Sequence, residues 1–359
     1  MKILDRYILK EIFDPFIFGL TAFTLILSAS MVMFELVRAV VIMGMPLYIA
    51  GQIFLYKLPS VVVYIFPMAM LLASILTFAR LSSDKEIIAF KAGGISLYRV
   101  ITPVLAMSIV VSFITLAFYE IVVPEANSAT KRLMIETKLE KAPKIKENIF
   151  IPELENGQLK RIFYARKSSG DSMQGVIIQE FDDGKLSQII NAKSAQWKED
   201  RWIFKDGTTY FLSDDGDYKH IMRFDEQQIV LKITPAELRQ GSANPDDMNF
   251  NKLKDYIALK KKMGENTTDL SIQLNLKIAI PFACFVFTLL GAPLGLNPTR
   301  KASSIGLGIS VIIIFIYYVL MFLSMAAGQM EIISPFLAAW LPNLITAGIG
   351  GWILFKAGQ

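Results

Sequence analysis

Six long apolar runs are the feature that most constrains this chain of 359 residues. A helix needs about 20 mostly apolar residues to cross the hydrocarbon core of a bilayer, and every run reaches that length. The runs are Phe13–Val41, Ile53–Phe78, Leu97–Val123, Leu270–Leu290, Ile305–Ala327 and Ile332–Phe355. The composition, 53% apolar and 19% charged, is typical of a membrane protein that also carries a polar domain. We therefore predict a membrane α-helical fold with six transmembrane helices.

Lysine and arginine are unevenly distributed among the short connections. They occur before the first run, between the second and third, between the fourth and fifth, and after the sixth. The two remaining short connections, GMPLYIAGQ and GQME, contain neither residue. Because cytoplasmic loops carry an excess of lysine and arginine, both termini and the connection at 80–96 are predicted to be cytoplasmic. The long insert is then predicted to be extracytoplasmic.

The runs divide the chain into three spans at 1–123, an inserted domain at 124–268, and three spans at 269–359. From about Phe150 to Ile233 the insert contains short segments rich in β-branched and aromatic residues, separated by turn signals such as SSGD and DDGK. This pattern predicts an all-β domain of the sandwich, barrel or jelly-roll type. The segments are RIFYARK, GVIIQEF, QIINAKSAQW, WIFKDGTTYFL and QQIVLKI, and two polar helical connectors, ATKRLMIETKLEK and NKLKDYIALKKKMGEN, flank them.

Several kinds of chemistry find little support in the sequence. Cys284 is the only cysteine and His220 the only histidine, so no disulfide forms within the chain and a histidine-dependent triad has one candidate. No Walker A, H-E-x-x-H or G-x-S-x-G motif occurs, and the spans show no buried acid–base relay for a proton-driven carrier. We expect no catalytic residue, metal, cofactor or nucleic-acid partner, and any transport requires an external source of energy.

The connection RLSSDKEIIAFKAGGIS at 80–96 has two interpretations. In the simpler one, Asp84 and Glu86 occupy the first turn of a helix, a serine at 82 or 83 caps it, and Gly93 with Gly94 ends it. That interpretation explains the charges only.

The apolar residues Ile87, Ile88 and Phe90 of the same connection would be exposed in the cytosol. A short amphipathic helix at the membrane surface is suited to a groove on a soluble partner, which is the second interpretation. The pattern alone weighs the two evenly.

Several motifs resemble the LptF/LptG permeases of the lipopolysaccharide export ABC transporter. Each motif is loose alone, but their order and spacing cover nearly the whole chain. They are LDRYILKEIF at 4–13, EIIAFKAGGIS at 86–96, NLKIAIPF at 275–282, PLGLNPTRK at 293–301 and LPN at 341–343.

The resemblance implies a function for the cytoplasmic connection. Segment 82–93 would be a coupling helix that docks on a cytoplasmic ABC ATPase dimer, with Glu86 in the position of the family's acid and Asp84, Ile87 and Phe90 beside it. ATP and Mg²⁺ would be bound by that partner. The helix would carry ATP-driven motion into the second and third spans.

The resemblance also implies a location and further partners. The chain would lie in the bacterial inner membrane, pair with a second permease that is identical or a paralogue, and extract lipopolysaccharide from the outer leaflet. Its insert would be a periplasmic jelly roll that stacks on the jelly rolls of bridge proteins and continues the lipid path. Inward positions such as Phe163 and Ile178 would then contact lipid, although an ordinary packed core is the simpler expectation.

Lipopolysaccharide carries phosphates, so its site is expected to include cations near the outer interface. The candidates are Arg38, Lys57, Lys131, Arg132 and Lys277. The simpler interpretation is that such side chains extend to lipid head groups, or that Arg38 pairs with Glu35. One subunit type of the family has a phosphate-binding lysine in the first span, where this chain has Met31, Val32 and Met33.

Three classes of function remain in competition. The first is a lipopolysaccharide permease or a permease for a different acidic lipid. The second is a structural membrane anchor of a periplasmic β-jelly-roll assembly, and the third is a membrane enzyme, which no motif supports. Small residues Gly306 and Gly308 in the fifth span would allow a close approach between helices.

Overall fold

The computed structural model describes residues 3–136, 146–155, 158–169, 171–182, 185–198, 201–213, 217–229, 245–262, 266–296 and 302–358. Contacts divide the chain into two units, one of residues 1–133 with 245–359 and one of residues 134–244. The first unit is helical and the second is a β-sheet. The second predicted connector, at 251–266, belongs to the helical unit, whereas the first, at 129–141, crosses the boundary at Leu133 and continues beyond the described residues.

The helical unit contains six helical runs that are long and apolar enough to cross a membrane, counted over the described residues. This confirms the six predicted spans. Their elements are α1 (Ile3–Ser28), η1 (Ala29–Met33), α2 (Phe34–Met43), α3 (Leu47–Ser83), α4 (Glu86–Ala92), α5 (Leu97–Ala117), η2 (Phe118–Val122), α6 (Val123–Glu136), η3 (Pro245–Asp247), α8 (Phe250–Lys262), α9 (Thr268–Gly295), α10 (Ala302–Gln329) and α11 (Pro335–Gly358).

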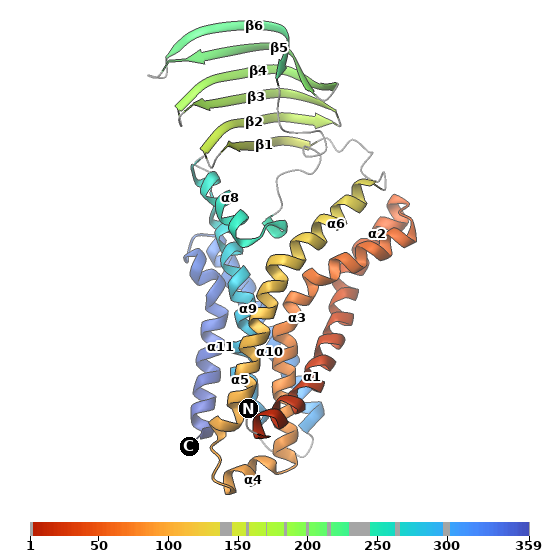
Figure 1. The fold of residues 1–359 in the computed structure, drawn as a ribbon, viewed down its shortest axis with the longest axis vertical. Coiled ribbons are helices and arrows are strands. Elements are labelled where there is room, and N and C mark those ends of the chain that lie inside the picture. The colour runs from red at the N-terminus through yellow and green to blue at the C-terminus, as the bar shows by residue number, and fades with distance from the viewer. Residues whose placement is uncertain are drawn as a thin grey trace. The chain divides into compact units, whose positions relative to one another are not determined.

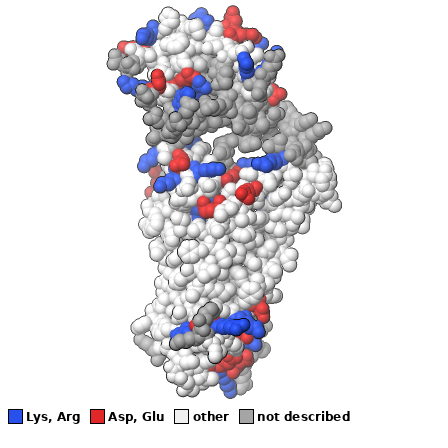
Figure 2. All heavy atoms as spheres, in the orientation of Figure 1, with Lys and Arg blue, Asp and Glu red and all other residues white. Residues whose placement is uncertain are grey.

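Helices α3 and α9 form the interior of the helical unit, whereas the first and fifth spans are mostly exposed along their length. A core cluster joins α1, α3, α5 and α9 through fully buried side chains such as Ile8, Ala69, Val104 and Cys284. Both chain ends lie at the end of the unit where α4 lies (Figure 1). Figure 2 shows an uncharged belt between two bands of charged side chains on the face drawn, as expected for a bilayer-spanning unit.

Glycines allow the interior helices to approach closely. A Cβ on Gly350 of α11 would lie 2.9 Å from the Leu290 backbone nitrogen of α9, and a Cβ on Gly295 would lie 2.6 Å from the Ile75 carbonyl oxygen of α3. Small residues at such contacts let membrane helices pack backbone against backbone. Gly306 does contact α3 closely, as predicted, but a Cβ on Gly308 would meet nothing within 4 Å.

The second unit is a single six-stranded antiparallel sheet in which the described strands follow one another in sequence order. The inserted all-β domain is therefore confirmed, and hairpins connect its neighbouring strands. The strands are β1 (Lys146–Glu155), β2 (Gln158–Ser169), β3 (Ser172–Asp182), β4 (Lys185–Lys198), β5 (Arg201–Leu212) and β6 (Tyr218–Ile229). Four of the predicted segments lie in β2 to β5, whereas QQIVLKI contributes only its first three residues to β6 and the remainder lies outside the described residues.

One face of the sheet is a packed core. Phe163 of β2 is opposite Ile178 of β3, which is opposite Ile190 of β4, and all three side chains are buried. The side chains alternate between the two faces because successive residues of a strand point in opposite directions. Phe163 and Ile178, which the resemblance placed on a lipid path, are packed in this core with Trp202 and Phe204.

The contact between α11 and α9 generates a prediction. Gly350→Ala adds a methyl group that collides with the α9 backbone, so we expect a loss of about 1–3 kcal/mol of stability, as for other overpacked cores. Gly348→Ala is the matched control, because a Cβ there meets nothing within 4 Å. Thermal unfolding in mild detergent should show a lower midpoint for Gly350→Ala only. Equal midpoints would show that the helices are not in close contact.

Candidate functional site

The cytoplasmic helix predicted at 82–93 is shorter in the structure, because α3 continues through Ser83 and α4 begins at Glu86. Lys85 separates the two helices with a left-handed backbone (φ 61°, ψ 14°), a conformation that is uncommon for residues other than glycine. Asp84 follows the last turn of α3, and its N–H donates to the Arg80 carbonyl oxygen at 2.9 Å. The prediction that Asp84 lies in the first turn of the cytoplasmic helix is therefore wrong.

The predicted serine cap is also wrong. No side chain caps the start of α4, and the Ser82 hydroxyl donates instead to the Leu296 carbonyl oxygen at 2.8 Å, next to the end of α9. The predicted end of the helix is confirmed, because Gly93 follows the last residue of α4 and Gly94 has a φ of 78°.

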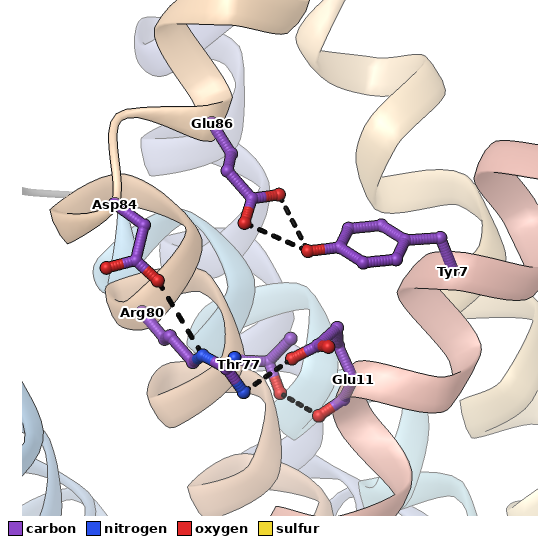
Figure 3. Close-up of polar contacts among 6 residues, drawn as sticks. All are labelled: Tyr7, Glu11, Thr77, Arg80, Asp84 and Glu86. Atoms are coloured by element: carbon purple, nitrogen blue, oxygen red, sulfur yellow. Dashed lines mark hydrogen bonds and ion pairs between the residues drawn. The ribbon is translucent and has the colours of Figure 1, made fainter.

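Glu86 faces the first transmembrane helix (Figure 3). The Tyr7 hydroxyl lies 2.9 Å from Glu86 Oε1 and 2.8 Å from Oε2, so its proton is shared between the two carboxylate oxygens. Both side chains are partly buried, and the Tyr7 ring packs against the core of the helical unit. A half-buried hydrogen bond to a charged group is worth about 1.5–3 kcal/mol, which makes this the strongest polar contact of α4.

Three ion pairs support the same junction. Arg80 of α3 contacts Glu11 of α1 at 2.7 Å and Asp84 at 3.7 Å, while Arg99 of α5 contacts Asp5 of α1 at 2.6 Å. The Arg80 side chain is 65% exposed, and exposed pairs contribute about 0–1 kcal/mol. They therefore orient the helix ends more than they stabilise them.

The apolar residues of α4 do not all face solvent. Ile87 is buried and Phe90 packs against the core of the helical unit, whereas Ile88 is 64% exposed. The expectation that all three are exposed holds only for Ile88. Lys91 and the preceding residue Lys85 are also exposed, as are Ala89 and Ala92. The exposed surface at α4 therefore combines apolar residues with two lysines.

Three of the five cations predicted near the outer interface are engaged within the chain. Lys57 pairs with Glu35, and Lys131 pairs with Asp247. The predicted alternative pairing of Arg38 with Glu35 is not formed. Arg38 and Arg132 are exposed, and no ion pair among the described residues includes either of them.

Lys277 is the third engaged cation, and it is only 2% exposed in the middle of α9. Its Nζ lies 3.6 Å from Glu120 Oε1 and 4.3 Å from the centre of the Tyr119 ring. The other Glu120 oxygen accepts the backbone N–H of Phe250, the first residue of α8, at 2.6 Å. Glu120 therefore joins the third span, the fourth span and the start of α8. The Lys277 side chain is buried, and the Glu120 side chain is 23% exposed.

Both Tyr119 and Glu120 belong to the π-helical turn η2, and a second π-turn, η1, interrupts the first span. Such turns are rare and occur frequently at functional sites. Sequence reasoning missed Tyr7, Glu11 and Glu120. The signal for Glu120 was present, because an acid near the end of an apolar run requires a partner.

Within the described part of the chain, no group of three or more His, Cys, Asp or Glu side chains is placed to hold a metal ion. The fold and these contacts define a multi-pass helical membrane protein with an inserted β-sheet unit. The protein-family model described as lipopolysaccharide export system permease LptF/LptG matches residues 6–356. The chain therefore belongs to the LptF/LptG family. A search of the curated proteins gave no match.

The Glu120–Lys277 pair generates a prediction. Lys277→Met and Glu120→Gln each leave a charged partner in a buried position, so each should cost about 1–3 kcal/mol or more of stability. The double variant should cost less than the sum, because no uncompensated charge remains. Thermal unfolding in detergent measures the coupling, with Lys57→Met as an exposed-pair control. Strictly additive losses would show that the two groups do not interact.

Proposed function

We propose that the chain is the membrane-spanning subunit of an ABC transporter that extracts lipopolysaccharide from the outer leaflet of the bacterial inner membrane. A separate cytoplasmic ATPase dimer binds ATP and Mg²⁺ and hydrolyses ATP, consistent with a chain that contains no Walker A motif. A second permease subunit completes the membrane part. The β-sheet unit passes the lipid to periplasmic bridge proteins.

The position of α4 is the observation that carries this proposal. It lies at the end of the helical unit that carries both chain ends (Figure 1), and the lysines and arginines of the short connections favour a cytoplasmic location for that end. Its exposed surface, Ile88 with Lys85 and Lys91, is available for a groove on the ATPase. Family membership supports the same assignment.

Glu86 contributes to coupling in this proposal by orienting α4. Its carboxylate is held by Tyr7, so a displacement of α4 by the ATPase is transmitted to the first span directly. The same displacement reaches the second and third spans through the peptide chain. The first span is mostly exposed along its length, which leaves it free to move against a partner permease or a lipid.

Arg38 and Arg132 are the preferred contacts for the substrate phosphates in this proposal. Both are exposed, whereas Lys57, Lys131 and Lys277 pair with carboxylates inside the chain. Guanidinium groups bind phosphate oxygens in a bidentate manner. The alternative function is a passive anchor of a periplasmic assembly. It requires neither exposed arginines nor a contact that holds α4 against α1.

Three substitutions test the proposal in a complex with the co-purified ATPase. Tyr7→Phe removes only the hydroxyl, and Glu86→Ala removes the carboxylate, so each loses a contact of about 1.5–3 kcal/mol. We expect each to reduce ATP-dependent release of lipopolysaccharide from nanodiscs by roughly tenfold or more. Asp84→Ala is the control, because its exposed contact with Arg80 is worth at most about 1 kcal/mol.

The comparison has two informative failures. Wild-type release in Tyr7→Phe and Glu86→Ala at matched expression would remove the orienting role from this pair. The passive anchor would be favoured if no ATPase co-purified with the wild-type chain and lipid release did not depend on ATP.

A further inference from the structure

Helix α8 carries an unusual excess of positive charge for its place in the chain. Its sequence FNKLKDYIALKKK contains five lysines and one acid, Asp255, over 13 residues. The helix ends six positions before the fourth span begins at Thr268. Lysines this close to a span are normally a cytoplasmic feature, yet α8 lies at the opposite end of the spans from α4 (Figure 1).

The lysines flank an apolar stripe. Leu253 is fully buried, and Tyr256 and Ile257, one turn further on, are half-buried. At about 100° per residue, Lys254 and Lys261 lie on one side of this stripe and Lys252 lies on the other. The stripe therefore packs against the rest of the protein, and the lysines on both sides of it are directed outward.

These lysines outnumber the acids of α8, whose sequence contains Asp255 alone. Lys252, Lys254 and Lys261 are exposed, and none of them takes part in an ion pair with a described residue. Lys131 and Lys57 at the same end of the unit do have carboxylate partners. Figure 2 shows lysine and arginine together with acidic side chains on this border of the uncharged belt. The three exposed ammonium groups are therefore accessible to anionic groups outside the protein.

We propose that α8 lies in the membrane interface and binds the phosphate head groups of anionic phospholipids in the adjoining leaflet through Lys252, Lys254 and Lys261. Ammonium groups attract phosphates as point charges, and lysines near an anionic surface each strengthen the attachment of a segment roughly fivefold. The inference goes beyond the export function, since it requires only that the chain spans a membrane.

Photo-cross-linking to lipid tests the proposal. A benzophenone side chain at exposed position Ala258 of α8 is placed in the full chain, in nanodiscs with equal parts of phosphatidylglycerol and phosphatidylcholine. We expect capture of phosphatidylglycerol over phosphatidylcholine by at least about fivefold, decreasing as salt is raised. The change of all three lysines to glutamine should bring the ratio close to one, and their change to arginine should preserve it.

A matched control removes the same charge elsewhere. Lys185, Lys193 and Lys198 are exposed on β4, and their change to glutamine should leave the ratio unaltered. A wild-type ratio near one, an unchanged ratio in the α8 glutamine variant, or capture of an acidic protein in place of lipid in native membranes would each overturn the proposal. The nanodiscs contain no ATPase, so the result is independent of the export function.

Discussion

Close packing of α3 and α9 is the constraint on which the other membrane helices depend. Both helices are mostly buried, and glycines such as Gly291 and Gly295 bring their backbones together. Without water inside a bilayer, association of helices depends on such close contact and on internal polar pairs. The fourth span carries Lys277, whose charge is acceptable there because Glu120 and the Tyr119 ring face it. The helices around this interior are held at their ends by polar contacts.

The end that carries α4 shows how these polar contacts are distributed. Asp5, Tyr7 and Glu11 lie within the first turns of α1, and each contacts a different element: α5, α4 and α3. Tyr7 binds a partly buried carboxylate, whereas Glu11 pairs with Arg80, whose side chain is 65% exposed and whose contact contributes less. In the proposed exporter, α4 and the start of the first span therefore act as one element. The first span is otherwise mostly exposed.

The number and order of spans, the inserted β-unit and the end of α4 at Gly93 were predictable, because each depends on a local signal. These signals are the length of the apolar runs, the alternation of apolar and polar residues in the strands, and the glycines that end a helix. The partners of Glu86 were not, since Tyr7 is 79 positions away and only the packing of α1 on α3 brings the two together. Asp84 was misassigned because α3 continues through Ser83 and the Asp84 N–H still donates to the Arg80 carbonyl oxygen. The left-handed backbone of Lys85 then separates α3 from α4, which begins at Glu86. Strands β1 and β6 include many polar residues, and so only the end of β6 was named as a strand segment.

The most direct test of this account is the distance between α1 and α4 during the ATPase cycle. In a Cys284→Ser background, spin labels at exposed positions Lys10 and Ala92 report on this junction, and labels at Ala92 and Lys356 report on α4 relative to the end of α11. We predict that binding of a non-hydrolysable ATP analogue to the complex leaves the 10–92 distance narrow and unchanged while the 92–356 distance shifts. A 10–92 distance that shifts or broadens in this complex would contradict the account.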